Sequence, residues 1–378
     1  MKILITVGIY PPDIGGPASF VPKIANLLSQ NSNEVTVICL SNNKIKDEEP
    51  YKVKRILRNQ NLLIRWIKTV SLIILHGRKV DLIFVNGLPM ESYVANIFLR
   101  KKLIRKIVGD WAWERARNRG IINESFDEFQ SNSHNLHIEI AKFSRGWTAT
   151  KADIVITPSK HLAKVVENWG VEHEKLKIIY NGTNITNNNF KNKNNETTNL
   201  ITVGRLAPWK NIDSIIEAVH LLKLNNFDLT LFIVGSGPME FDLKKQVDDL
   251  NLTKNVIFTG QKKYSELAEY YMKSDIYIQA SGYEGLPHVL LEAINFNLAL
   301  ISTPIGGTNE ILEDGKNGFI LNLENGKRPS AENLKNLILE ATNNRQLTEE
   351  QKLNAKKLLN FNFDESKNLS KYLEVLNK

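Results

Sequence analysis

Ser281-Gly-Tyr-Glu-Gly-Leu-Pro-His-Val-Leu-Leu-Glu292 is the stretch of sequence that decides the fold. Residues 275–280 before it have the β-branched and aromatic content of a buried parallel strand, and residues 289–296 have the apolar spacing of a short helix. The glycines and the proline between them let the backbone turn sharply and approach a ligand closely. Glu284 in this loop and Glu292 in the helix can then face one crevice, outside the carboxyl ends of parallel strands, where ligands bind in such sheets.

Strand-like and helix-like segments alternate along the whole chain, which is the pattern of parallel βα units. The expected strands are residues 3–7, 34–39, 82–86, 106–109, 154–157, 176–179, 200–203, 229–234, 256–260, 276–280, 299–302 and 318–321. The chain has 378 residues, of which 42% are hydrophobic, so two domains are the default expectation. Residues 184–199 are rich in Asn, Lys and Thr, and we interpret them as the linker; a general bias toward asparagine is the competing explanation.

A second group of polar residues lies in Leu200-Ile-Thr-Val-Gly-Arg-Leu-Ala-Pro-Trp-Lys-Asn211. Arg205 and Lys210 stand where a strand ends and a helix begins, so two cations and several free backbone N–H groups converge there. This arrangement predicts an anion site. The alternative is that Arg205 pairs with a nearby acid and that Lys210 is a solvated surface charge.

A third segment lies at the amino end of the chain. Residues 2–7 form a buried-strand run, and a helical stretch is expected from Ala18 to about Gln30. Gly15 and Gly16 just before this helix leave their backbone amides open to a phosphate or a sugar. A glycine pair before a helix is common, so this signal is weak when it is taken alone.

These segments together resemble retaining glycosyltransferases of family 4 (group 1), which have the GT-B fold. The two acids match the E-x7-E motif of that family, and residues 200–211 are similar to its strand, Gly-Arg-Leu loop and lysine. Residues 301–319 are similar to its glycine-rich turn, helix and closing strand. The resemblance spans nearly the whole chain and is strongest from Leu200 to Phe319.

The resemblance implies an α/β fold with two Rossmann-like domains that face a central cleft. Residues 1–190 are then an amino-terminal acceptor-binding domain, and residues 191–358 are a carboxyl-terminal domain that binds the nucleotide sugar. Residues 359–378 are expected to form a helix that crosses back and packs on the amino-terminal domain.

The resemblance also implies the roles of single residues. The expected donor-binding residues are Gly15, Gly16, Arg205, Lys210, Gly235, Gly237, Glu284, Gly285, Leu286, Pro287 and Glu292. Glu292 is expected at the ribose hydroxyls and Glu284 at the transferred sugar, where each charge-assisted hydrogen bond contributes about 1.5–3 kcal/mol. Arg205 and Lys210 would stabilise the departing diphosphate, and we expect both to be catalytic together with Glu284 and Asp110. The alternative role for Glu292 is that of a helix acid that interacts with the macrodipole. The alternative for the loop at 235–238 is a plain βα turn that does not contact the donor.

No metal and no cofactor is expected. Many transferases hold a divalent cation with an Asp-x-Asp motif, and this sequence contains none. The stretch His134-Asn-Leu-His-Ile-Glu139 does not have the spacing of a closed zinc site, so we interpret it as a polar loop that enters a helix.

The residues that follow the strand expected at 106–109 depart from the family pattern. Many family members carry a His followed by an Asp there, and here the nearest equivalent is Asp110, without a His. We expect Asp110 to contact the sugar or to receive the proton of the acceptor, and Trp111 and Trp113 to stack on a sugar ring in the acceptor site. The alternative is two core tryptophans and an acid that is satisfied by Arg115 or Arg117.

The net charge of +8 is unevenly placed, because residues 52–106 contain thirteen Lys or Arg but only two acids. A basic, apolar helix in this region predicts contact with an anionic membrane, and the alternative is an ordinary core-packed helix with a solvated basic face. Nucleic acid is not expected as a partner, because no binding motif accompanies the charge. Cys39 is the only cysteine, and we find neither a signal peptide nor a run of about 20 apolar residues, so we expect a cytoplasmic protein, peripheral at the inner face of the cell membrane.

The sequence therefore favours a metal-independent, retaining glycosyltransferase. It would move a hexose-type sugar from a UDP- or GDP-sugar to a glycan or lipid-linked acceptor, in cell-surface polysaccharide or glycolipid synthesis. A nucleotide-sugar epimerase or hydrolase of similar fold is one alternative, and a catalytically silent protein that binds sugar nucleotides is another.

Overall fold

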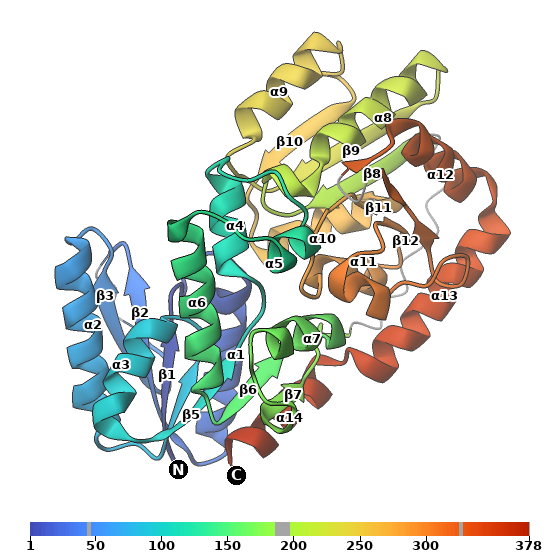
Figure 1. Ribbon diagram of the computed structural model, residues 1–378. Helices are drawn as coiled ribbons and strands as arrows, with labels where there is room; N and C mark the ends of the chain where they lie inside the picture. Colours follow the sequence, from blue (N-terminus) through green and yellow to red (C-terminus); the bar gives the residue numbers. More distant parts are fainter. Residues whose placement is uncertain (44–46, 186–196, 325–327, 378) are drawn as a thin grey trace. The chain divides into compact units, whose positions relative to one another are not determined.

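The computed structural model describes residues 1–43, 47–185, 197–324 and 328–377. The chain forms two compact units, each around its own parallel sheet (Figure 1). The first unit contains Met1–Asp110, Asn135–Ile179 and Ser366–Lys378, and the second contains Trp111–His134 and Tyr180–Glu365. Two Rossmann-like α/β domains, the fold expected from the alternating pattern, are confirmed.

The first unit has a seven-stranded parallel sheet with the order β3-β2-β1-β4-β5-β6-β7. Its strands are β1 (Lys2–Val7), β2 (Glu34–Ser41), β3 (Lys52–Leu57), β4 (Leu82–Val85), β5 (Lys102–Lys106), β6 (Ile154–Thr157) and β7 (Leu176–Ile178). The helices of this unit are α1 (Gly16–Gln30), α2 (Leu62–Gly77), α3 (Pro89–Leu99), α6 (Leu136–Thr150), α7 (Lys160–Asn168) and α14 (Glu365–Leu376), with a 3₁₀ turn η1 (His173–Lys175). Five of the six β1 residues are buried, as helices on both faces of a parallel sheet require.

The last helix belongs to the first unit, although it follows the second unit in the chain. Tyr372 and Leu376 of α14 lie in one buried cluster with Ile3 and Ile5 of β1 and with Ile24 of α1. The ring of Phe20 lies 5.0 Å from the ring of Tyr372, between centroids. The expected return of the terminal helix to the amino-terminal domain is therefore confirmed.

The second unit has a six-stranded parallel sheet with the order β10-β9-β8-β11-β12-β13. Its strands are β8 (Thr198–Val203), β9 (Leu229–Val234), β10 (Val256–Gly260), β11 (Ile276–Gln279), β12 (Ala299–Ser302) and β13 (Phe319–Ile320), and β14 (Leu323–Glu324) pairs antiparallel with β15 (Arg328–Pro329). The helices are α4 (Trp111–Asn118), α5 (Phe126–Ser131), α8 (Ile212–Leu224), α9 (Glu240–Asp249), α10 (Tyr264–Lys273), α11 (His288–Asn295), α12 (Ala331–Asn343) and α13 (Arg345–Asn362), with 3₁₀ turns η2 (Pro208–Lys210) and η3 (Gly306–Glu310).

Two strands of the first unit differ from the sequence-based expectation. The strand expected at 106–109 is wrong, because β5 covers Lys102–Lys106 and pairs with β4 and β6. The strand β3, which no expectation included, extends the sheet beside β2. Most of the linker predicted at 184–199 falls on residues 186–196, which lie outside the described residues, and Thr198 already begins β8.

Candidate functional site in the second unit

The end of β8 and the turn after it carry the two predicted cations. Arg205 follows Gly204 at the carboxyl end of the strand and is exposed, and its guanidinium takes part in no hydrogen bond or ion pair with the residues that the structure describes. Lys210 ends η2, and its ammonium forms an ion pair with Glu284, a geometry that neither sequence alternative for Lys210 named. One cation is thus exposed and the other is already oriented by an acid.

The loop after β11 carries Glu284, and the helix α11 that follows it carries Glu292. Ser281 donates its hydroxyl to the Glu284 carboxylate at 2.7 Å, and Tyr271 donates its own to Glu292 at 3.0 Å. Burial raises the pKa of Tyr277, and the negative charges of Glu284 and Glu292 raise it further. The charges of both acids therefore act on the hydroxyl of Tyr277.

The loops after β8, β9, β11 and β12 approach each other backbone against backbone. A Cβ on Gly235, whose φ is 145°, would lie 1.8 Å from the carbonyl oxygen of Gly204. A Cβ on Gly306, whose φ is 52°, would lie 1.9 Å from the carbonyl oxygen of Glu284. Side chains at these two positions would force the loops apart, so glycine is required for the β9 loop to meet the β8 loop and for the β12 loop to meet the β11 loop.

The remaining predicted donor residues lie in the same loops. A Cβ on Gly237 would lie 2.4 Å from the carbonyl oxygen of Leu206, and a Cβ on Gly307 would lie 2.1 Å from the carbonyl oxygen of Gly285. Leu286 is buried in an apolar cluster, so its side chain supports the loop rather than lining it. Pro287 is the N-cap residue of α11, which leaves the first N–H groups of that helix at the loop.

The segment Trp111–His134 belongs to the second unit and packs on this site through four aromatic rings, which we call the aromatic brace: Trp113, Phe126, Trp209 and Tyr283. The ring of Trp113 lies 5.2 Å from Trp209 and 5.3 Å from Tyr283, and Phe126 stacks on Tyr283 at 3.8 Å, all between centroids. Trp113 is 1% exposed, so no face of its ring is open to a sugar, whereas Trp111 is 37% exposed. Trp113 is therefore a core tryptophan, which is the alternative that the sequence left open.

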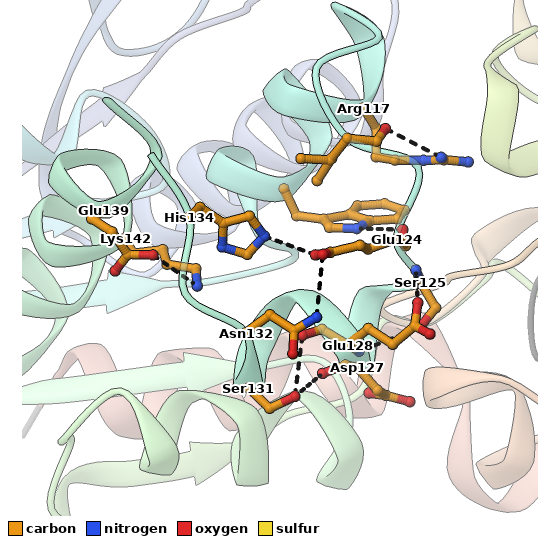
Figure 2. A network of polar contacts seen from close by, with 12 residues as sticks. Arg117, Glu124, Ser125, Asp127, Glu128, Ser131, Asn132, His134, Glu139 and Lys142 are labelled. Carbon is orange, nitrogen blue, oxygen red and sulfur yellow. Dashed lines mark hydrogen bonds and ion pairs between the residues drawn. The ribbon is translucent and has the colours of Figure 1, made fainter. Parts of the chain in front are cut away.

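Polar contacts hold the same segment in place (Figure 2). Ser125 and Glu128 form a capping box at the start of α5, and His134 Nε2 lies 2.7 Å from the Glu124 carboxylate. Asn132 donates to the other oxygen of that carboxylate at 3.2 Å. The hydrogen bond from His134, the largest cause, holds the pKa of Glu124 below its usual range. The loop between α5 and α6 is therefore tied by its own side chains.

The stretch 134–139 is a polar loop that enters α6. Asn135 is the N-cap residue, and its side chain accepts a hydrogen bond from the backbone N–H of Ile138 at 3.2 Å. Within the described ranges no group of three or more His, Cys, Asp or Glu residues is arranged to hold a metal ion.

Glu114 on α4 is a charged residue of this site that the sequence reasoning did not single out. Burial raises the pKa of its carboxyl, the charges of Lys210 and Arg205 oppose that shift, and the charge of Glu284 adds to it. The contact of α4 with η2, together with the contact of Trp113 with Tyr283, brings Glu114 to these residues. No local sequence signal reveals the contact of α4 with η2. The two tryptophans next to Glu114 and Lys210 in the chain, Trp113 and Trp209, are an indirect signal of it.

Three predicted residues lie in the first unit. Asp110 is fully buried and forms an ion pair with Arg145 of α6, not with Arg115 or Arg117 as the sequence alternative supposed. Gly15 is the N-cap residue of α1, and a Cβ at Gly16 would have no atom within 4 Å. The start of α1 is therefore open at Gly16, as an anion-binding helix end requires.

Comparisons with known proteins identify the family. The model of "Glycosyltransferase Family 4" matches residues 14–187, and that of "Glycosyl transferases group 1" matches residues 184–358. The chain belongs to the family 4 (group 1) glycosyltransferases. Together the two models account for nearly the whole chain.

Relatives with known names support the assignment. An uncharacterized glycosyltransferase of Methanocaldococcus jannaschii is 31% identical over 60% of this chain and 59% of its own length, so the match spans less than two thirds of that relative. The N-acetylgalactosamine-N,N'-diacetylbacillosaminyl-diphospho-undecaprenol 4-alpha-N-acetylgalactosaminyltransferase of Campylobacter jejuni is 26% identical over 84% of this chain and 85% of its own.

Solved structures share the fold. Anabaena HepE in complex with UDP and glucose matches with a TM-score of 0.77 and 20% identity, over 100% of this family 4 chain and 99% of HepE. Sucrose-phosphate synthase from Thermosynechococcus elongatus matches with a TM-score of 0.80 and 18% identity, over 99% and 98% of the two chains. Among the described helices, none is both long and apolar enough to cross a membrane.

Proposed function

We propose that the protein transfers a hexose-type sugar from a nucleoside-diphosphate sugar to a glycan or lipid-linked acceptor, with retention of configuration and without a metal. The observation that carries the proposal is the group formed by Arg205, Lys210 and Glu284 at the meeting point of the glycine loops. This group offers two cations for a diphosphate and one carboxylate for sugar hydroxyls.

The chemistry follows from these charges. When the anomeric bond breaks, the electron pair leaves with the diphosphate, and negative charge grows on the oxygen that joined it to the sugar. Lys210 is oriented near that charge by Glu284 before the reaction begins, and Arg205 adds a second cation beside it, so both would stabilise the transition state. Glu284, already oriented by Lys210 and Ser281, accepts hydrogen bonds from the sugar hydroxyls.

The relatives suggest which donors and acceptors to test first. HepE was solved with UDP and glucose, and the Campylobacter relative is named for transfer to a diphospho-undecaprenol-linked sugar. We therefore propose a UDP-sugar as donor and a polyprenyl-diphosphate-linked glycan as acceptor, in the synthesis of a cell-surface polysaccharide or glycolipid.

The experiment incubates the purified protein with UDP- and GDP-sugars in EDTA, with and without polyprenyl-linked acceptors. We expect nucleotide release that depends on the acceptor, and a glycosylated product that keeps the anomeric configuration. Release without an acceptor would indicate the hydrolase alternative, and conversion of the sugar without release would indicate the epimerase. Binding of the nucleotide sugar without any turnover would indicate the catalytically silent binding protein.

We also propose that the first unit contacts an anionic membrane surface through α2, where an acceptor with a lipid anchor would lie. Helix α2 exposes a set of large apolar side chains beside Arg65 and Lys68: Leu62, Leu63, Ile64, Ile67 and Leu75. Helix α3 packs against both α2 and α6 (Figure 1). It adds the exposed side chain of Phe98. A basic, apolar helix of this kind fits the interface of an anionic bilayer.

A further inference from the structure

Tyr271 connects two helices of the second unit at the proposed donor site. It lies on α10, and its hydroxyl donates to the Oε2 atom of Glu292 on α11 at 3.0 Å. The same hydroxyl lies 3.3 Å from the backbone carbonyl oxygen of Val289. A phenol has one proton to donate, and the carboxylate is both the nearer and the charged acceptor. The hydrogen bond to Glu292 is therefore the stronger of the two.

The ring of Tyr271 is held in place independently of its hydroxyl. Tyr271 is 1% exposed and belongs to an apolar cluster of the second unit. It stacks there on Phe296, at 5.1 Å between centroids and 18° between ring planes. Phe296 is the C-cap residue of α11, the helix that carries Glu292. Core packing thus holds the phenol against α11, so the hydroxyl reaches Glu292 from a rigid support.

The surroundings of Tyr271 also keep its hydroxyl in the form that donates. Burial raises the pKa of Tyr271 well above its ordinary value, and the negative charge of Glu292 raises it further. The hydroxyl therefore keeps its proton at neutral pH. Glu292 is partly buried, so a fixed donor at its carboxylate favours one orientation of the side chain before any ligand binds.

The orientation of Glu292 affects nucleotide binding if this carboxylate meets the ribose. A glutamate side chain that is already held loses less conformational freedom when a ligand binds. The two neighbouring hydroxyls of a ribose can both donate to a carboxylate that is held at one angle, whereas a 2′-deoxyribose offers only one of them. A held Glu292 therefore favours a ribonucleotide over a deoxyribonucleotide.

We propose that Tyr271 is a positioning residue that holds Glu292 toward the ribose and so makes the donor site selective for ribonucleoside-diphosphate sugars. The proposal rests on the proposed function, and it adds that dTDP-sugars, whose nucleotide is a deoxyribonucleotide, are poor donors. The alternative is that the hydrogen bond from Tyr271 only ties α10 to α11.

The test measures the Kd of UDP and of 2′-deoxy-UDP by calorimetry, or of the corresponding GDP pair if the enzyme binds GDP. The wild type should prefer the ribonucleotide about tenfold or more, the contribution of one charge-assisted hydrogen bond. Tyr271→Phe keeps the stacked ring and loses only the hydroxyl, so the Kd of UDP should weaken about 3- to 10-fold. The loss should be smaller for 2′-deoxy-UDP, so the preference falls. Tyr270→Phe, the same change at the neighbouring position of α10, should keep both wild-type values.

A double-mutant cycle separates positioning of Glu292 from support of the fold. In the Glu292→Ala background, Tyr271→Phe should change the Kd of UDP by less than about twofold, because the carboxylate that it orients is gone. An equal loss for both nucleotides, or the same loss in the Glu292→Ala background, would overturn the proposal in favour of a structural tie. An unchanged preference in Tyr271→Phe would overturn it as well. A wild type that binds neither UDP nor GDP would instead overturn the proposed function.

Discussion

At the scale of single residues, Arg205 and Lys210 make the sharpest prediction, because they are the cations that we propose to stabilise the charge that develops in transfer. Replacing either by alanine should lower kcat by about 100-fold, the cost of losing one preorganised donor to a developing anion. Lys254→Ala removes an exposed cation of the same unit and should leave kcat unchanged. Nucleotide release under saturating donor measures the effect, and a loss of less than about threefold in both variants would contradict it.

Glu292 makes a prediction about donor affinity rather than rate. If its carboxylate binds the ribose hydroxyls, Glu292→Ala loses about 1.5–3 kcal/mol, which weakens the Kd for the donor roughly 10- to 100-fold. Glu269→Ala on the exposed face of α10 is the matched control. The macrodipole alternative predicts a different outcome in calorimetric titration with UDP, an unchanged Kd together with a small loss of thermal stability.

Single residues also mark how far the sequence could predict the site. Local sequence patterns predict four residues of the site, because each stands at a strand end or helix start that such patterns reveal: Arg205, Lys210, Glu284 and Glu292. Glu114 could not be predicted from the sequence, because its place depends on the packing of Trp113 against Trp209. These two residues are 96 positions apart in the chain. Contacts of that kind follow from tertiary structure, which no local spacing encodes.

At the scale of secondary structure elements, β5 explains why a strand was misplaced. Its residues Arg105 and Lys106 are buried, which a sequence pattern does not suggest for two adjacent cations. Arg105 donates to Thr148 at 2.7 Å, and the Lys106 ammonium lies 3.2 Å from the centroid of the Phe20 ring. These neighbours interact with the two buried charges, so the strand can include them and begins at Lys102. The prediction had placed the strand at residues 106–109 because of the apolar residues there.

Lys106 in β5 gives a prediction about stability. Burial holds the pKa of Lys106 well below its usual range, so the folded state binds fewer protons than the unfolded state between that pKa and 10.5. Stability should therefore rise with pH through that window. Lys106→Met removes the buried charge and should raise the free energy of unfolding at pH 7 by about 1 kcal/mol or more.

The advantage of Lys106→Met should shrink as the pH rises toward 10.5, because above that value the unfolded wild-type lysine is already neutral. Urea unfolding followed by tryptophan fluorescence at several pH values measures both chains, and Lys68→Met on an exposed position is the control. A methionine variant that is less stable than the wild type at pH 7 would show instead that the ammonium over Phe20 is net stabilising.

Helix α2 gives a prediction about association with membranes. The double variant Leu63→Gln and Ile67→Gln removes two exposed apolar side chains one helical turn apart, so binding to vesicles that contain phosphatidylglycerol should weaken about 10-fold or more. Leu224→Gln, an equally exposed apolar position in the second unit, should bind like the wild type. Equal sedimentation of all three proteins with these vesicles would leave α2 as a core-packed helix with a solvated face.

At the scale of the whole molecule, the two-unit architecture was predictable because it follows from alternation repeated twelve times along the chain. The assignment of Trp111–His134 to the second unit was not, because this segment follows a strand of the first unit in the chain. Its apolar residues complete the core of the other unit through the aromatic brace. The order of segments along the chain is thus a poor guide to which core a segment joins.

The second unit holds the cations, so nucleotide binding should stabilise it without a metal. UDP at about 100 times its Kd adds about 2.7 kcal/mol to the stability of the form that binds it, which raises Tm by several degrees. The shift should be equal in EDTA and in Mg²⁺ if Arg205 and Lys210 neutralise the diphosphate as we propose. It should vanish in the variant Arg205→Ala and Lys210→Ala, while Lys254→Ala keeps it. A shift that appears only with Mg²⁺ would show that the diphosphate needs a cation that these side chains do not supply.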